Sequence, residues 1–200
     1  MKQLDILLNQ AEKDICVFID LLKKWQKAVN LISDSTIKDV WNRHVLDSAQ
    51  LYSLIPETSK IMVDLGSGAG FPALVLAILN QVHQGPLEKI ILIESDQKKA
   101  LFLREVVRQL SLPVEILNKR IETVSNIQAD LLTARALAPL QQLLLLGKKM
   151  ITPSTTCLFL KGKKAEQEIQ KCQIPCSIQK IRSVTSSESC ILKITEVHYD

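Results

Sequence analysis

The first part of the chain carries apolar residues at helical spacing. Between residues 4 and 25 they recur at steps of three and four, with lysines and acids on the opposite face, which predicts one amphipathic helix. The loop that follows contains side chains that cap helices, and Asp34 or Ser35 is expected to cap a second helix over residues 36–52. We therefore expect a helical extension over residues 1–57.

From residue 58 the pattern changes to short apolar runs that alternate with amphipathic stretches. Continuous apolar runs of this length are typical of strands buried on both faces of a parallel sheet. Residues 178–184 and 190–197 alternate apolar and polar positions, as an antiparallel hairpin would. The predicted fold of residues 58–200 is therefore α/β, a doubly wound and mostly parallel sheet with a closing antiparallel hairpin. The expected strands are 61–64, 89–94, 114–117, 130–134 and 156–160, and the expected helices are 73–79, 98–110, 140–149 and 165–171.

Composition and charge limit the class of protein. The 200 residues are 46% hydrophobic, enough for one well-formed core, and the net charge of +4 is compatible with a polyanionic partner. The five cysteines are scattered and form no C-x-x-C pair, so we expect no metal site and no disulfide framework. No apolar run is long enough to cross a bilayer, and the N-terminus lacks a signal-peptide core. We expect a cytoplasmic protein without a membrane partner and, because no apolar stripe is left over, a monomer.

One turn has the composition of a ligand-binding loop. The first strand runs to Asp64, and Gly66, Gly68 and Gly70 follow it. Alternating glycines let the backbone turn sharply and approach a ligand closely, because no Cβ intervenes. Pro72 then suits the first turn of the next helix. The sequence therefore predicts a strand–loop–helix cradle.

The glycine spacing discriminates between ligands. The dinucleotide fingerprint is G-x-G-x-x-G, and Phe71 stands here in place of its third glycine. A P-loop is excluded because no Lys-Ser or Lys-Thr pair follows the glycines. A G-x-G-x-G loop preceded by an acid resembles motif I of the S-adenosylmethionine-dependent methyltransferases. That resemblance implies a phosphate-free ligand with an amino-acid end, a ribose and an adenine, and an ordinary tight turn is the alternative.

The predicted sheet brings further candidates to the same edge. Ligands bind beyond the carboxyl ends of the strands in such sheets, where Glu94, Ile121, Glu122, Arg135 and Lys161 are expected. Glu94 is placed to accept hydrogen bonds from ribose hydroxyls, with a solvated loop carboxylate as the alternative. Arg135 could bind the carboxylate of the cofactor or a phosphate of the substrate, or be an unpaired surface arginine.

No residue is predicted to be catalytic. Residues 133–136 lack the Asn/Asp-Pro-Pro-aromatic motif usual in methyltransferases that act on exocyclic amines, and His44 is the one histidine in a suggestive context. Pro175-Cys176 superficially matches the cysteine of pyrimidine C5 enzymes, but it lies far from the predicted site strands, so Cys176 is expected to be structural. An acceptor such as the N7 nitrogen of guanine has a free lone pair and needs no base. Orientation and electrostatics would then suffice.

Several motifs taken together carry a family resemblance: residues 25–31, 43–48 (Arg-His-Val-Leu-Asp-Ser), 63–72, 120–122, 133–139 and 160–162. The combination resembles the RsmG (GidB) family of bacterial methyltransferases, which act on the N7 nitrogen of a guanosine in 16S ribosomal RNA. The resemblance implies a Rossmann-like class I methyltransferase sheet, S-adenosyl-L-methionine as the cofactor, and 16S ribosomal RNA or the small ribosomal subunit as the partner.

By that resemblance the cofactor is bound by residues from several strand ends. Ala73 departs from the glycine usual in the family, which should alter how the helix starts without touching the cradle, and Ile32-Ser33 replaces a usual threonine. The implied contacts are Gly66, Gly68, Gly70, Phe71, Ile121, Glu122 and Arg135, with Glu94 at the ribose.

Basic side chains could follow an RNA backbone, and each is also explained as a solvated charge. No sequence-reading RNA module is present, so we expect shape and a flipped-out base to select the target. Two other functions stay open: a small-molecule methyltransferase, disfavoured by an aromatic content of 4%, and a cofactor-binding ribosome assembly factor without turnover. The basic candidates are Lys23, Lys24, Lys27, Arg43, Lys98, Lys99, Lys161, Lys163 and Lys164.

Overall fold

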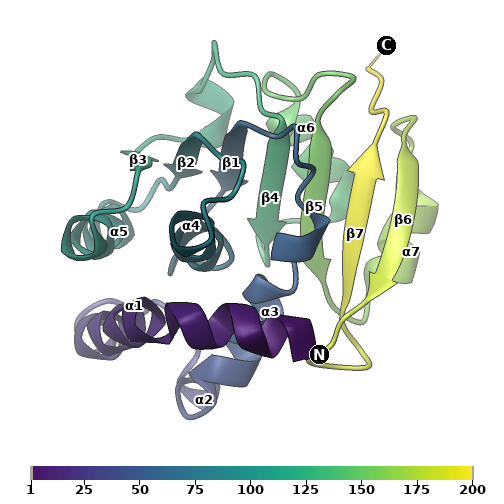
Figure 1. Ribbon diagram of the computed structural model, residues 1–200. Helices are drawn as coiled ribbons and strands as arrows, with labels where there is room; N and C mark the ends of the chain where they lie inside the picture. The colour runs from purple at the N-terminus through teal and green to yellow at the C-terminus, as the bar shows by residue number, and fades with distance from the viewer. Residues whose placement is uncertain (1, 200) are drawn as a thin grey trace.

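A seven-stranded sheet with the order β3-β2-β1-β4-β5-β7-β6 forms the centre of the molecule (Figure 1), in a computed structural model that describes residues 2–199. Strands β1 to β5 pair in parallel, while β7 runs antiparallel between β5 and β6. The predicted mostly parallel sheet with a closing hairpin is confirmed. The strands are β1 (Ile61–Leu65), β2 (Lys89–Ile93), β3 (Val114–Leu117), β4 (Leu131–Arg135), β5 (Thr156–Lys161), β6 (Ser177–Arg182) and β7 (Cys190–Thr195).

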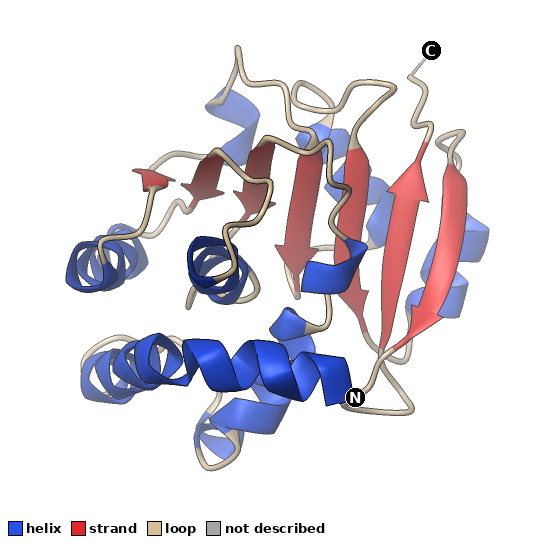
Figure 2. Cartoon of the chain, viewed as in Figure 1, coloured by secondary structure: helices blue, strands red, loops and turns tan. Residues whose placement is uncertain are grey.

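Helices cover both faces of this sheet. Helices α4 (Ala73–Val82) and α5 (Gln97–Leu110) lie on one face, and α6 (Leu140–Gly147) and α7 (Ala165–Lys171) lie on the other (Figure 2). Helix α1 (Lys2–Gln26) confirms the predicted N-terminal helix and lies across α4 and α5 on the side away from the sheet (Figure 1). Within residues 2–199, no helix is both long enough and apolar enough to span a bilayer.

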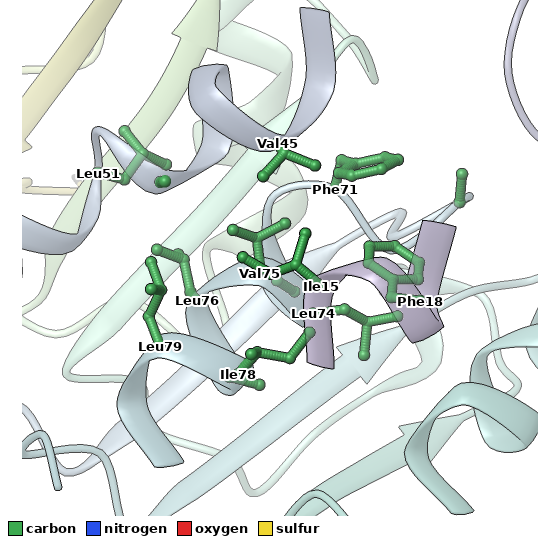
Figure 3. Close-up of a cluster of buried hydrophobic side chains, with 14 of the residues drawn as sticks. Ile15, Phe18, Val45, Leu51, Phe71, Leu74, Val75, Leu76, Ile78 and Leu79 are labelled. Atoms are coloured by element: carbon green, nitrogen blue, oxygen red, sulfur yellow. The ribbon is translucent and has the colours of Figure 1, made fainter. Parts of the chain in front are cut away.

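The position of α4 explains its composition. Residues 73–80 are all buried, because the helix is covered by the sheet on one side and by the N-terminal helices on the other. A helix without a polar face is expected where both sides are buried. Figure 3 shows Ile15 and Phe18 of α1 packed with Leu74 and Ile78 of α4. The N-terminal helices therefore share one hydrophobic core with this face of the sheet.

The second helix predicted in the extension is broken into short pieces. Asp34 and Ser35 do not cap it: Ser33 is the N-cap residue, and its side chain makes no capping hydrogen bond. A π-helical segment replaces the expected regular turns and buries both His44 and Val45. Such segments insert one extra residue into a helix and are frequent at functional sites. The pieces are α2 (Asp34–Ile37), the π-helix η1 (Trp41–Leu46), α3 (Asp47–Ala49) and the 3₁₀ helix η2 (Tyr52–Leu54).

Candidate functional site

The alignment of the central strands brings the predicted site residues together. Strands β1, β2 and β4 are in register, so all three end at the same level of the sheet. Gly66 and Glu94 directly follow β1 and β2, and Arg135 is the last residue of β4. They leave the sheet beside the switch point between β1 and β4, where doubly wound sheets bind ligands.

A cavity of about 600 Å³ opens at this place. Its volume lies in the range of small-molecule sites, roughly 300–1,000 Å³. The 3₁₀ helix η3 (Ile121–Thr123) supplies part of its wall. Of the eight predicted binding residues, seven line the cavity and Gly70 does not. The seven are Gly66, Gly68, Phe71, Glu94, Ile121, Glu122 and Arg135.

The three glycines do different things in the loop. All have positive φ, at 63°, 54° and 87° for Gly66, Gly68 and Gly70, so each occupies a backbone region that disfavours side chains. A Cβ at Gly66 would lie 2.7 Å from the Leu137 side chain, whereas a Cβ at Gly68 would make only an ordinary contact, 3.8 Å from the Gly66 carbonyl oxygen. A Cβ at Gly70 would overlap Leu74 of α4. Gly66 and Gly68 therefore keep the cavity free, while Gly70 lets the helix pack under the loop.

Glu94 ties the glycine loop to the end of β2. Its Oε2 accepts a hydrogen bond of 2.8 Å from the backbone N–H of Gly68, and its Oε1 accepts one of 2.7 Å from the N–H of Asp96. The side chain is buried at the wall of the cavity. Because a carboxylate accepts about four hydrogen bonds, Glu94 keeps capacity for hydroxyl groups of a ligand.

Asp64 lies in the core beneath the loop. Thr133 Oγ1 donates a 2.6 Å hydrogen bond to Asp64 Oδ1, while Oδ2 has no partner among residues 2–199. Burial raises the pKa of this carboxyl group, the hydroxyl groups of Ser67 and Thr133 lower it, and the nearby Glu94 raises it, which together give a pKa of about 7. Removing a carboxylate from water is unfavourable without full pairing, so the buried group retains its proton more strongly than an ordinary aspartate.

Arg135 is contacted on three sides at the opposite wall. Its Nη2 donates to His44 Nδ1, its Nη1 lies 3.6 Å from Asp47 Oδ2, and its guanidinium lies 5.7 Å from the ring centroid of Phe71. Nη1 is buried and makes no hydrogen bond to any residue the structure describes. A buried charged donor without an acceptor is unfavourable. This atom is therefore the strongest candidate in the cavity wall for binding an acceptor group of a ligand.

His44 is an uncharged hydrogen-bond acceptor for Arg135. A guanidinium group can only donate, so Nδ1 must accept and Nε2–H must donate to Thr36 Oγ1, at 2.9 Å. Thr36 in turn donates to the carbonyl oxygen of Ser33, at 2.8 Å. Burial, followed by the charges of Arg135 and Arg43, lowers the pKa of the imidazole to about 3. The imidazole is therefore neutral throughout the physiological range.

A second cavity of about 460 Å³ adjoins the first. The two share Thr36, His44 and residues 135–138 as a common wall. Lys161, predicted at this edge, lies in the second cavity, where its Nζ is 2.8 Å from Glu168 Oε2 and donates to the Ala138 carbonyl oxygen at 2.7 Å. Glu168 also accepts from the backbone N–H of Leu140, at 2.9 Å. This pair holds the turn between β4 and α6.

Several cavity residues have no motif that predicts them. Thr36 lines the first cavity from α2, the first piece of the broken helix, and Leu137 lines it from a turn in which Ala136 has a φ of 52°. Neither feature has a recognisable sequence pattern. Among the basic candidates, Lys99 lines the first cavity, and Arg43 and Lys161 line the second.

The structure also describes Cys176, which is expected to be structural, and the residue types that could bind a metal ion. Cys176 packs against the core cluster of the α6 and α7 face, and burial raises the pKa of its thiol to about 11, which disfavours the nucleophilic thiolate. Within the described chain, no group of three or more His, Cys, Asp or Glu residues is arranged to bind a metal ion.

Comparison with known proteins links this chain to one family. Residues 11–194 match the family model described as rRNA small subunit methyltransferase G, GidB. A ribosomal RNA small subunit methyltransferase G from Paramagnetospirillum magneticum is 44% identical over 185 residues, covering 90% of this chain and 86% of that protein. The corresponding protein from Cereibacter sphaeroides is 40% identical over 196 residues, covering 97% of this chain and 94% of that protein.

Solved structures with the same fold are more distant in sequence. An S-adenosylmethionine-dependent methyltransferase from Aquifex aeolicus aligns with a TM-score of 0.61 at 16% identity, over 83% of this chain and 100% of that one. A ribosomal protein L11 methylase from Lactobacillus delbrueckii subsp. bulgaricus aligns with a TM-score of 0.59 at 14% identity, over 76% of this chain and 77% of that one. The expected methyltransferase-type sheet is confirmed.

Proposed function

The chain belongs to the GidB family of small-subunit ribosomal RNA methyltransferases, and from that membership we propose that it transfers a methyl group from S-adenosyl-L-methionine to the N7 nitrogen of a guanosine in 16S ribosomal RNA. The observation that carries the proposal is the first cavity, which is lined by the glycine loop, by the buried carboxylate of Glu94 and by Arg135, whose buried Nη1 makes no hydrogen bond to a described residue. These groups match the ribose and the amino-acid end of this cofactor.

The residues present fit the cofactor. Gly66 and Gly68 leave the wall without side chains, so a ligand can contact the backbone there. We assign Glu94 to the ribose hydroxyls, Arg135 Nη1 to the carboxylate, and the apolar Ile121 to the adenine ring. Phe71 and Glu122 complete the wall, and Gly70 contributes through the packing of α4.

The lining of the second cavity suits an acceptor that needs no base. His44 uses both ring nitrogens in hydrogen bonds, and Lys161 is paired with Glu168. Asp47 Oδ1 already accepts from Thr185 Oγ1 at 2.8 Å. The cofactor, when bound, supplies an electrophilic methyl group on sulfonium. Because guanine N7 carries a free lone pair, the protein needs only to orient the base and exclude water, and no catalytic residue is assigned.

Exposed cations at the rims of both cavities support RNA as the partner. Lys119 and Arg120 are exposed beside the first cavity, and Arg43 is exposed beside the second. Cations placed in this way neutralise backbone phosphates without reading sequence. We propose that the chain acts as a monomer in the cytoplasm, with residues 1–57 closing the site built by the domain of residues 58–200. Its substrate is the small ribosomal subunit or its 16S RNA.

The test uses small subunits from cells that lack this protein. The purified protein is incubated with these subunits, or with naked 16S RNA, and with S-adenosylmethionine labelled on the methyl group, after which the RNA is digested to nucleosides for mass analysis. We expect the label in 7-methylguanosine. Label in another nucleoside would contradict the N7 assignment. RNA binding without any label would favour an assembly factor, and cofactor binding without either would favour a small-molecule methyltransferase.

A further inference from the structure

Arg135 is held by three residues that come from two separate parts of the chain. Phe71 belongs to the glycine loop, while His44 and Asp47 belong to the broken helix of the N-terminal extension. The imidazole of His44 also stacks on the Phe71 ring, with centroids 4.9 Å apart and planes 25° apart. One imidazole therefore contacts both the loop and the guanidinium that border the first cavity.

The hydrogen bond between the two side chains depends on which groups surround the imidazole. The charged groups that face it are Arg135 from β4, Arg43 from its own segment and Asp39 just before that segment. Two of these three are cations, and the Thr36 hydroxyl oxygen accepts the hydrogen bond from Nε2–H. A protonated imidazole has no acceptor atom and would repel the guanidinium. The neutral ring is thus the only form that can make this contact.

We propose that His44 is a positioning residue for the methyl-transfer site: it holds the Arg135 guanidinium at the wall shared by the two cavities, so that Nη1 stays free for the carboxylate of the cofactor. The inference rests on the proposed function, since it assigns that carboxylate to Arg135.

The position of Asp47 explains why such a residue is needed. Its Oδ2 is 3.6 Å from Arg135 Nη1, too far for a hydrogen bond but close enough to attract the guanidinium. Without the acceptor at His44, Arg135 can move toward Asp47 and use Nη1 in a salt bridge. The donor that the ligand needs would then be lost while the fold is retained.

The first experiment reads the imidazole directly, without ligand. Nitrogen NMR resolves the three histidines, His44, His83 and His198, across pH 5 to 8. We expect His44 to show a proton on Nε2, an unprotonated Nδ1 and no titration in this range. Titration of His44 with a midpoint between pH 6 and 7, or a proton on Nδ1, would overturn the inference.

The second experiment distinguishes the role of the Nδ1 acceptor of His44 from the role of its ring, which stacks on Phe71. His44→Asn keeps an acceptor close to the position of Nδ1, whereas His44→Phe keeps the stack on Phe71 and loses the acceptor. Calorimetric affinity for S-adenosylmethionine is measured for both variants, with thermal unfolding as the control for folding. We expect His44→Phe to weaken binding by about tenfold, the scale of one hydrogen bond to a charged group, and His44→Asn to stay within about threefold of the parent.

A variant pair in the Arg135→Ala background completes the test. If His44 acts through Arg135, His44→Phe should change the affinity of the Arg135→Ala protein by less than about twofold. An equal loss in both backgrounds, or equal loss for Phe and Asn, would overturn the inference. Should His44→Phe fail to fold, His44→Gln takes its place, because its amide can bond Thr36 but cannot reach Arg135. A parent protein that binds no S-adenosylmethionine would instead refute the proposed function.

Discussion

Two turns border the first cavity, and they are stabilised by different kinds of interaction. The turn between β1 and α4 depends on close packing and backbone conformation, with three glycines at positive φ next to a helix whose residues 73–80 are all buried. The turn between β4 and α6 depends on charged and polar side chains, with Lys161 and Glu168 on one side of it and His44 and Asp47 on the other. The first should be sensitive to added volume, and the second to lost charge.

The two turns also differ in how many parts of the chain they need. Residues 64–74 contain the three glycines and much of their packing, and the contacts from outside this range come mainly from Ile93, Glu94 and Leu137. The second turn draws its contacts from the N-terminal extension, from β5 and from α7. A local motif therefore describes the first, whereas the second exists only after the whole domain has folded.

Adding volume to the first turn should have the largest effect on function. Gly66→Val places a β-branched side chain at a φ of 63° and 2.7 Å or less from Leu137, so it strains the loop and fills the cavity wall. We expect a loss of S-adenosylmethionine affinity of at least about 100-fold, roughly 3 kcal/mol, in a domain that remains folded by circular dichroism. Gly162→Ala is the matched control, because its Cβ would meet nothing within 4 Å. Unchanged affinity in Gly66→Val would contradict the role of the loop.

Removing charge from the second turn should mainly reduce stability. Lys161→Met leaves Glu168 without its cation and the Ala138 carbonyl oxygen without its donor. Because the Lys161 side chain is only 7% exposed, we expect the free energy of unfolding in urea to fall by about 3 kcal/mol, the lower end for a broken buried ion pair.

An exposed ion pair on the same segment provides the comparison. The Lys163 and Glu188 side chains are 73% and 58% exposed at a separation of 2.7 Å, so Lys163→Met should change the free energy of unfolding by less than about 1 kcal/mol. Equal losses for the lysine variants at 161 and 163 would show that burial of the first pair is not what stabilises the second turn.

Asp64 is a buried carboxyl group beneath the first turn, which otherwise depends on packing. It should make the free energy of unfolding depend on pH. Its pKa is about 7 in the folded chain and near 3.8 in the unfolded chain, so the folded state binds more protons between these values. The free energy of unfolding contributed by Asp64 must therefore fall as pH rises from about 4 to 7, by at most about 1.4 kcal/mol per pH unit.

The variant Asp64→Asn isolates the contribution of Asp64 to the pH dependence of stability. His44 acts in the opposite direction, because its lowered pKa makes the folded state less stable as pH falls below 6.5. The difference in unfolding free energy between Asp64→Asn and the parent removes the His44 contribution from the comparison. We expect this difference to shift in favour of the variant as pH rises from 4 to 7, and a difference independent of pH would contradict the raised pKa of Asp64.

The smallest effect is expected at the rim of the second cavity. Arg43→Ala removes one exposed cation beside the Arg135 wall and should lower the slope of log affinity for 16S RNA against log salt concentration by about 0.7 to 0.9. Lys13→Ala removes an exposed cation from α1 that lines neither cavity and should leave the slope unchanged. Equal slopes of log affinity against log salt concentration for the two variants would show that RNA does not bind at the rim of the second cavity.

The contrast between the turns also explains what the sequence could predict. The strands, α4, α5 and α7 were predictable because apolar runs and helical spacing depend on local residues. The N-cap of α5 is also local: the Asp96 side chain accepts hydrogen bonds from the backbone N–H groups of Lys98 and Lys99. The cavity residues at the strand ends follow from the topology of a parallel sheet.

The rest depends on contacts between distant segments. Nothing local shows that residues 36–52 break into a π-helical segment that turns His44 toward Phe71. The pattern of apolar residues there is compatible with one regular helix. The role of Asp47 and the pairing of Lys161 with Glu168 likewise appear only when β4, β5, α3 and α7 are assembled.

A calorimetric titration tests the central claim most directly. The folded parent protein and Gly66→Val are each titrated with S-adenosylmethionine and, separately, with the dinucleotide NAD. The account predicts saturable one-to-one binding of S-adenosylmethionine to the parent, no binding to Gly66→Val, and no heat of binding from NAD with either protein. Tight binding of NAD to the parent, with none of S-adenosylmethionine, would contradict it.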